Sequence, residues 1–182
     1  MKIILIYSYG GLIMNFKRLD IKDFVCNPFS KIGKDWMAVS SGNVENYNSM
    51  TASWGGLGVM WGKDVAFTFI RSQRYTKKFI DINDKFSLCF FDEKYKKSLS
   101  YLGTVSRNDN PNKMNNCDLT TCFVDDVPCF EEADIILICK KLYVQKMEPT
   151  CFIDTTLDNK WYENKDYHFM YVSSIENIFS KL

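Results

Sequence analysis

The chain has 182 residues, of which 46% are hydrophobic and 15% aromatic, so we expect one domain with a sizeable core. A formal net charge of +1 argues against nucleic acid or a membrane surface as a partner. The seven cysteines are scattered without C-x-x-C spacing, and the chain contains one histidine. We therefore expect no metal site and a reducing, cytoplasmic location.

The first thirteen residues differ in character from the rest of the chain. Residues 1–13 (MKIILIYSYGGLI) are apolar but too few to span a membrane, and no small-residue cleavage site follows them. We expect them to form an N-terminal extension, with Met14 as a candidate first residue. Residues 14–182 are then predicted to fold as a single domain.

In chain order, the apolar patterning predicts many short strands and two short helices. The predicted strands are 36–42, 48–53, 65–70, 86–91 and 133–147. The predicted helices are 76–83 and 92–102. The segments expected to be extended, irregular or looped are 16–29, 104–116, 118–129 and 150–159. This pattern is typical of a mainly β protein, a largely antiparallel barrel with short helices.

The stretch from Asn48 to Thr76 carries the strongest signal of a binding site. It begins with small and hydroxyl-bearing residues, which let a flat ligand approach the backbone. It ends with Arg71, Arg74 and Thr76 just after a strand, where two guanidinium forks and a helix N-terminus suit a phosphate. The alternative is a glycine-rich turn with surface arginines, since the run Gly55–Gly58 is not a nucleotide fingerprint.

Two ordered motifs resemble one family. Residues 48–61 fit the pattern N-x-M-T-A-S-W-G-G-x-G-x-x-W, and residues 71–76 fit R-P-x-R-Y-T with Ser72 in place of proline. In these motifs the chain resembles the flavin reductase-like family, specifically its flavoredoxin-type branch. The resemblance implies an FMN-binding split barrel that forms a homodimer.

The resemblance also implies a set of residues around non-covalently bound FMN. Backbone groups of Met50, Thr51, Ala52 and Ser53 would line the isoalloxazine edge, and Arg71, Arg74 and Thr76 would hold the phosphate. The remaining candidate cofactor-binding residues are Trp36, Trp54, Tyr75 and Ser106. Trp36 could equally be a core residue, and Ser106 lies in a loop that departs from the family pattern. His168 is expected to be structural, so no side chain is assigned a catalytic role.

Two functions fit this resemblance. One is an NAD(P)H-dependent flavin reductase that passes electrons through bound FMN. The other is a flavoredoxin-like carrier that exchanges electrons with a protein partner without using NAD(P)H. Because the cofactor itself carries the redox chemistry, neither function requires a conventional acid–base residue.

Overall fold

The computed structural model describes residues 6–8, 11–13 and 16–182, and a large antiparallel sheet dominates it. Seven strands follow one another in the order β5-β4-β8-β11-β12-β7-β6, and β3 pairs with the far end of β12. Their bounds are β3 Phe16–Leu19, β4 Met37–Gly42, β5 Tyr47–Ala52, β6 Gly55–Met60, β7 Lys63–Arg71, β8 Lys85–Phe90, β11 Ile135–Lys146 and β12 His168–Lys181. The five predicted strands and the mainly β class are therefore confirmed.

A smaller sheet has the order β10-β9-β1-β2, with β1 at Ile6–Ser8, β2 at Gly11–Ile13, β9 at Thr121–Val124 and β10 at Val127–Phe130. The expectation that 118–129 is irregular was wrong, because β9 and β10 form a tight hairpin there. Asp125 and Asp126 both have positive φ at its turn, which matches the twist of the strands. Within the predicted extension, β1 pairs with β9 and β2 pairs with β1, while residues 1–5, 9–10 and Met14 lie outside the described residues.

In the part of the chain that the structure describes, three α-helices and several short helical turns accompany the sheet. Both predicted helices are confirmed as α1 (Tyr75–Ile82) and as the turn η3 (Glu93–Tyr95) followed by α2 (Lys96–Thr104). The predicted loop 150–159 instead contains η4 (Pro149–Cys151) and the start of α3 (Thr155–Trp161), which Asp154 caps. The predicted extended segment 16–29 is a strand only in β3; η1 (Ile21–Asp23) follows, and the π-helix η2 (Phe29–Lys34) begins at its end. Within the described ranges, no helix is long and apolar enough to cross a membrane.

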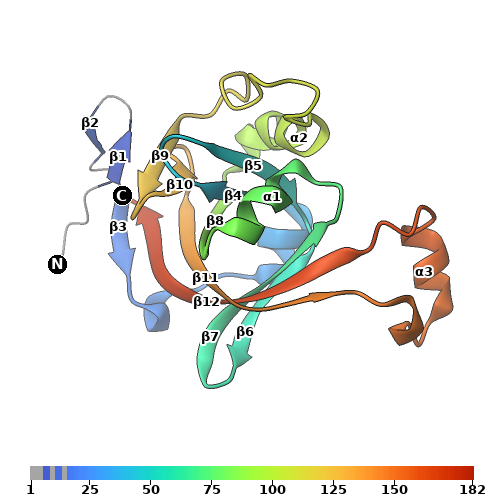
Figure 1. Ribbon diagram of the computed structural model, residues 1–182. Coiled ribbons are helices and arrows are strands. Elements are labelled where there is room, and N and C mark those ends of the chain that lie inside the picture. The colour runs from blue at the N-terminus through green and yellow to red at the C-terminus, as the bar shows by residue number, and fades with distance from the viewer. Residues whose placement is uncertain (1–5, 9–10, 14–15) are drawn as a thin grey trace.

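The sheet separates two hydrophobic clusters. One lies against α2 and the β9–β10 hairpin, and the other fills the barrel between β4, β8, β7 and β12. Cys89 and Cys139 are fully buried, one in each cluster. Beyond the barrel, β11 and β12 continue as a long two-stranded arm that carries α3 at its tip (Figure 1).

Strand β5 forms an open edge of the large sheet, because it ends the strand order and, among the described strands, it pairs with β4 alone. The other side of an edge strand offers unpaired backbone N–H and C=O groups. Helix α2 packs close to β5, where a Cβ on Gly103 would lie 3.2 Å from the Thr51 Cβ. Strand β7 also contacts β5 and leads directly into α1. The fold thus places α1 and the end of β7 beside the open edge of β5.

The β4–β5 turn that sets the position of this edge depends on Gly42. Its φ is +130°, and an added Cβ would overlap the Asn46 carbonyl and the Tyr47 backbone. We expect Gly42→Ala to lower the free energy of unfolding by about 3 kcal/mol through backbone strain and overpacking. Gly62→Ala is the matched control, because Gly62 also has positive φ but has open space around it. Denaturant unfolding should show that Gly62→Ala lowers the free energy of unfolding by about 1 kcal/mol. Equal losses in the two variants would contradict the predicted overlap at Gly42.

Candidate functional site

A cavity of about 430 Å³ lies where β5, the end of β7, the start of α1 and the segment after α2 meet. It brings together six of the eleven predicted cofactor-binding residues: Met50, Arg71, Arg74, Tyr75, Thr76 and Ser106. Asn48, Gln73, Val105 and Lys113 complete its lining. Helix α1 begins here with Arg74 at its N-cap and no side-chain capping bond. Its first turn therefore presents N–H groups and the positive end of the helix dipole to the cavity.

Two cations in the cavity bond to carbonyl groups rather than to carboxylates. The Arg74 guanidinium donates to the Gly103 carbonyl. The Lys113 Nζ donates to the carbonyls of Ser49 and Leu102, both at 2.8 Å, and its side chain is buried. A carbonyl carries no full charge, so the cavity keeps a strong positive potential. It is suited to a dianion.

The pKa values of Lys113 and Arg74 are both lowered, as expected for buried cations that lie near other positive charges. Burial and the neighbouring Arg74 charge lower the pKa of Lys113 to about 8. Burial and the Arg71 charge also lower the pKa of the Arg74 guanidinium. Both shifts disfavour the charged forms in the free protein. An anion bound between these groups would relieve that cost and raise both pKa values.

Arg71 is held differently from Arg74. Its Nη1 pairs with Asp166 Oδ2 at 2.5 Å, its Nη2 donates to the Trp161 carbonyl, and its guanidinium lies over the Tyr162 ring. Burial works to raise the pKa of Asp166, but the hydrogen bonds from Arg71 and Gln73 outweigh it and keep the pKa low. The charge of Arg71 is therefore largely balanced by Asp166, and this ion pair ties the α3 arm to the rim of the cavity.

Two hydroxyl groups in the cavity are oriented as donors. Thr76 Oγ1 accepts a hydrogen bond from Asn48 Nδ2 at 2.8 Å, and Ser106 Oγ accepts one from the Asn108 N–H at 3.2 Å. Each oxygen is already an acceptor, so its own hydrogen is free to point elsewhere. Both residues line the cavity, where such hydrogens can reach an anion.

Ser53 and Trp54 lie at the other end of β5, in an apolar hollow of about 630 Å³. Phe29 and Ile32 of η2 also line this hollow, as do Gly56 and neighbouring residues of β6. The Trp54 ring packs 4.7 Å from the His168 ring and 5.1 Å from the Trp161 ring, between centroids. The open edge of β5 therefore connects a polar, cationic cavity with an apolar hollow.

Three predicted residues line neither hollow. The Thr51 hydroxyl donates to the Leu99 carbonyl of α2, and Ala52 is buried in the barrel core. Only the backbone of these two residues remains for a ligand. The Trp36 ring packs against the core and under the Lys96 ammonium at 3.5 Å.

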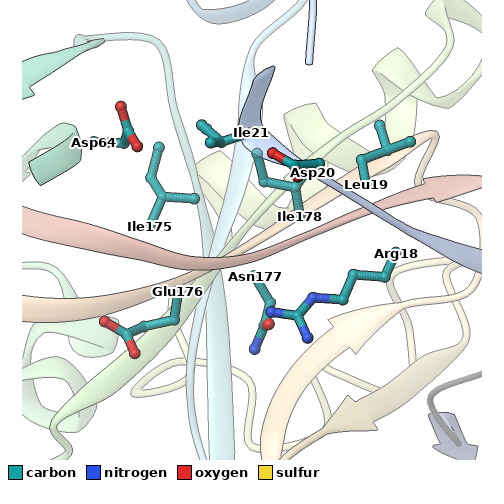
Figure 2. Close-up of a pocket in the computed structure, with 9 residues that line it drawn as sticks. All are labelled: Arg18, Leu19, Asp20, Ile21, Asp64, Ile175, Glu176, Asn177 and Ile178. Carbon is teal, nitrogen blue, oxygen red and sulfur yellow. The ribbon is translucent and has the colours of Figure 1, made fainter. Parts of the chain in front are cut away.

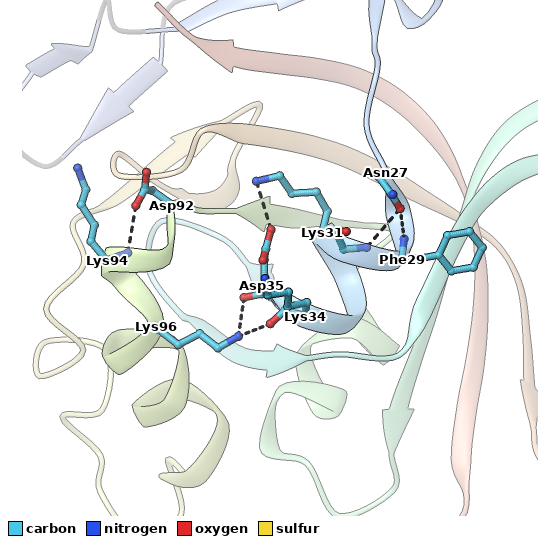
Figure 3. A network of polar contacts seen from close by, with 9 residues as sticks. Asn27, Phe29, Lys31, Lys34, Asp35, Asp92, Lys94 and Lys96 are labelled. Carbon is cyan, nitrogen blue, oxygen red and sulfur yellow. Dashed lines mark hydrogen bonds and ion pairs between the residues drawn. The ribbon is translucent and has the colours of Figure 1, made fainter.

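Figure 3 shows the polar network that holds Lys96 in this position. Lys96 donates to the carbonyls of Lys34 and Asp35, and Lys31 pairs with Asp35. The Asn27 side chain caps the start of η2 in the same network. These contacts fix the segment that lines the apolar hollow.

Asn48, Gln73 and Lys113 also line the cavity but were not among the predicted cofactor-binding residues. The 104–116 segment is turn-rich, as expected for a surface loop, but it folds back so that Lys113 and Met114 are buried. A lysine in a run of Asn and Asp residues gives no sequence signal of burial. Asn48 was visible at the start of the first motif, yet its bond to Thr76 depends on the fold.

A further hollow of about 650 Å³ lies beside β3 and the end of β12 (Figure 2). Its charged lining residues are Arg18, Asp20, Asp64 and Glu176, all exposed. With three carboxylates and one guanidinium, the side chains that line this hollow carry a net negative charge, opposite in sign to the cavity at α1. Among the described residues, no group of three His, Cys, Asp or Glu side chains is placed to hold a metal ion.

No family model and no curated protein matches the sequence. Solved structures do match. An FMN-binding domain of a flavin reductases-like enzyme from Shewanella baltica superposes with a TM-score of 0.67 and 15% identity, covering 92% of this chain and 78% of that one. The flavoredoxin of Methanosarcina acetivorans gives 0.61 and 17%, covering 81% and 68%. The styrene monooxygenase flavin reductase of Pseudomonas putida gives 0.56 and 12%, covering 79% and 78%. These similarities confirm the predicted fold: the chain is a split barrel, with the same fold as these three structures.

The low pKa of Lys113 predicts a pH limit for anion binding. Lys113 loses its charge as the pH rises through about 8, so affinity should fall above that pH. We expect the Kd for sulfate, whose charge is constant over this range, to rise about tenfold from pH 7 to pH 9. Lys113→Met should bind sulfate more weakly at pH 7 and lose this dependence. A pH-dependent Kd that persists in the variant would assign the titration to another group.

His168 predicts a second pH dependence, this time of stability. It is buried, and its Nδ1 lies 2.7 Å from the Tyr162 hydroxyl oxygen. Burial and the Arg71 charge lower its pKa to about 4. The unfolded chain binds a proton near pH 6.5, so stability should be lost as the pH falls below 6.5.

We expect the titration of His168 to lower the free energy of unfolding by about 2 kcal/mol when the pH falls from 7 to 5. The measurement is denaturant unfolding at both pH values, with His168→Gln as the variant that lacks the titrating ring. An equal loss in the variant would show that carboxyl groups, not His168, cause the fall.

Proposed function

We propose that this chain is an FMN-binding flavoprotein oxidoreductase that holds FMN non-covalently along the open edge of β5. The observation that supports this most strongly is the cavity at the start of α1, where Arg74 and Lys113 are both without a carboxylate partner among the described residues. A phosphate dianion would balance these two charges. Thr76 and Ser106 would add hydroxyl donors, and the first turn of α1 would add backbone donors.

The flavin ring system would lie toward the other end of the strand. From Asn48 to Ser53 the chain advances about 17 Å at about 3.3 Å per residue, which is comparable with the extended length of FMN. Within Met50, Thr51, Ala52 and Ser53, the backbone groups that point away from β4 would bond polar atoms on the ring edge. Tyr75 and Trp54 offer aromatic surfaces at the two ends of this path. The residues along β5 thus fit both the length and the polarity of the cofactor.

When bound, FMN would supply the capacity to accept a hydride or single electrons. The protein residues would bind it, orient it and keep water away. The apolar hollow beside Ser53 and Trp54 is of the size and polarity that suit a flat ring such as nicotinamide. This hollow favours an NAD(P)H-dependent flavin reductase. The alternative is a flavoredoxin-like carrier, which needs the same cradle but exchanges electrons with a protein partner.

The arm formed by β11, β12 and α3 supports a homodimer. Its exposed apolar side chains are Leu142, Tyr143, Val144, Ile153, Leu157 and Trp161. Apolar surface gathered on a projecting arm is typical of a protein–protein contact. We propose that a second copy of the chain covers this surface, and that the protein works in the cytoplasm.

The two functions differ in their response to nicotinamide. FMN-loaded protein should lose its oxidised-flavin absorption when NADH or NADPH is added without oxygen. If only dithionite bleaches the bound flavin, the electron carrier is the correct function. A protein that binds no FMN under any condition would overturn the proposal.

The phosphate assignment predicts a selective effect of Arg74. Losing its charged hydrogen bond should weaken FMN binding in Arg74→Ala by about 1.5–3 kcal/mol. The affinity for riboflavin, which lacks the phosphate, should change little. Fluorescence titration of both flavins measures the difference, and Arg18→Ala, which removes an exposed cation of β3, is the control. Equal losses for FMN and riboflavin would remove Arg74 from the phosphate site.

A further inference from the structure

A group of aromatic side chains joins the apolar hollow to the α3 arm. Trp54 lines the hollow, and its ring centroid lies 4.7 Å from that of His168 and 5.1 Å from that of Trp161. His168 also contacts Tyr162, because its Nδ1 lies 2.7 Å from the hydroxyl oxygen. The Tyr162 ring stacks on the Tyr167 ring, with centroids 4.9 Å apart and 28° between the planes. The rings from Trp54 to Tyr167 therefore form a continuous series of contacts.

Each of the two stacked tyrosines has a proton acceptor of its own. The Tyr162 hydroxyl lies 2.7 Å from His168 Nδ1 and 3.4 Å from Met147 Sδ. Because a thioether is a weak acceptor, the bond to the imidazole is the stronger of the two. The Tyr167 hydroxyl donates to Asp158 Oδ1 at 2.8 Å. Both distances lie within the range over which a proton is transferred directly.

A phenol with a base beside it is suited to one-electron chemistry. A phenol that loses an electron becomes a strong acid, so it is oxidised readily only where a base takes the hydroxyl proton. Burial strengthens this requirement, since a charged radical in an apolar site would be costly. Tyr162 and Tyr167 are both buried, and both have such a base. Burial holds the pKa of His168 at about 4, so at neutral pH the imidazole is uncharged and one ring nitrogen can accept a proton.

We propose that these residues form a one-electron relay that protects the apolar hollow from oxidation: Trp54, once oxidised, regains its electron from Tyr162, and His168 Nδ1 takes the Tyr162 proton. The oxidant is a small oxygen-centred radical that enters the hollow and leaves reduced by one electron. Before the transfer, neutral His168 carries its hydrogen on Nε2. The relay does not depend on the proposed function, because no flavin takes part in it.

The second tyrosine returns the relay to its starting state. Tyr167 gives an electron to the Tyr162 radical and its proton to Asp158, while His168 returns its proton to Tyr162. Asp158 also pairs with Lys165, whose side chain is 59% exposed, so this end of the relay lies close to solvent. There a soluble reductant, a thiol or ascorbate, supplies one electron to Tyr167, and the proton returns from Asp158. In total, one electron passes from the reductant to the oxidant, and the protein is unchanged.

Trp61 and Tyr143 form a matched pair that lacks a base. Their ring centroids are 6.2 Å apart, and the Tyr143 hydroxyl donates to Gln145 Oε1 at 2.8 Å. A neutral amide oxygen accepts a hydrogen bond but does not take up a proton at neutral pH. Tyr143 is therefore expected to give Trp61 no protection, although the two rings are neighbours.

Oxidation by azide radicals tests the relay, because these radicals remove single electrons from indoles. The full-length protein, without added flavin, receives a fixed radical dose, and mass spectrometry of its peptides measures the irreversible oxidation of Trp54 and Trp61. We expect Tyr162→Phe to raise the oxidation of Trp54 several-fold and to leave that of Trp61 unchanged. Tyr143→Phe should change neither. Unchanged oxidation of Trp54 in Tyr162→Phe would overturn the inference, as would a similar rise at Trp61 in Tyr143→Phe.

His168→Gln separates proton transfer from packing. The glutamine amide can accept the hydrogen bond but cannot take the proton, so Trp54 oxidation should rise even though Tyr162 is present. Electron paramagnetic resonance of rapidly frozen samples should show a tyrosyl radical in the oxidised wild-type protein. Tyr162→Phe and His168→Gln should both reduce this signal, and Tyr143→Phe should not. A signal that Tyr162→Phe leaves undiminished would overturn the inference, and this variant decides the outcome if His168→Gln does not fold.

Discussion

The positive charge of Arg74 and Lys113 at one end of an open strand edge is the constraint on which the candidate site depends. Burial disfavours both charges, and their hydrogen bonds go to carbonyl groups that cannot neutralise them. A folded protein keeps such an arrangement at a cost in stability. A bound dianion offsets that cost, so the same feature that strains the free protein provides the free energy for binding.

The charge of the neighbouring Arg71, in contrast, is balanced within the protein. Its charge is balanced by Asp166, and its second nitrogen holds the Trp161 carbonyl. Through these contacts the α3 arm is joined to the cavity rim, with Tyr162 and His168 buried behind it. Two arginines that look equivalent in the motif therefore have different partners. Arg74 is left to bind an anion, whereas Arg71 also holds the arm in place.

Much of this arrangement could be predicted from the sequence. The motifs at 48–61 and 71–76 indicated the split-barrel fold and contain five of the predicted residues that meet in one cavity. Local patterning found five strands, including the long β11, and two helices, since their apolar pattern is strong, but it did not predict β12, which is longer still. It failed for the β9–β10 hairpin, whose strands have four residues each. In α3, capping by Asp154 rather than an apolar stripe marks the start of the helix.

The remaining features depend on contacts between segments far apart in the chain. Nothing near Lys113 in sequence indicates that it will lie under Ser49 and Leu102, because the turn that buries it is made of polar residues. The pairing of Arg71 with Asp166 joins positions far apart in the chain and could not be predicted from either motif. Side-chain partners of this kind can be identified only once the fold is known. The fold itself could be predicted from the apolar patterning and the two motifs.

The central claim is that the cavity at the start of α1 encloses a phosphate. Phosphorus NMR of FMN-loaded protein tests it most directly, because the cofactor has one phosphorus atom. The account predicts a shifted resonance that stays unchanged from pH 5 to pH 8, since Arg74 and Lys113 keep the bound phosphate dianionic. A resonance that titrates with a pKa of about 6, as an exposed phosphate monoester does, would contradict it.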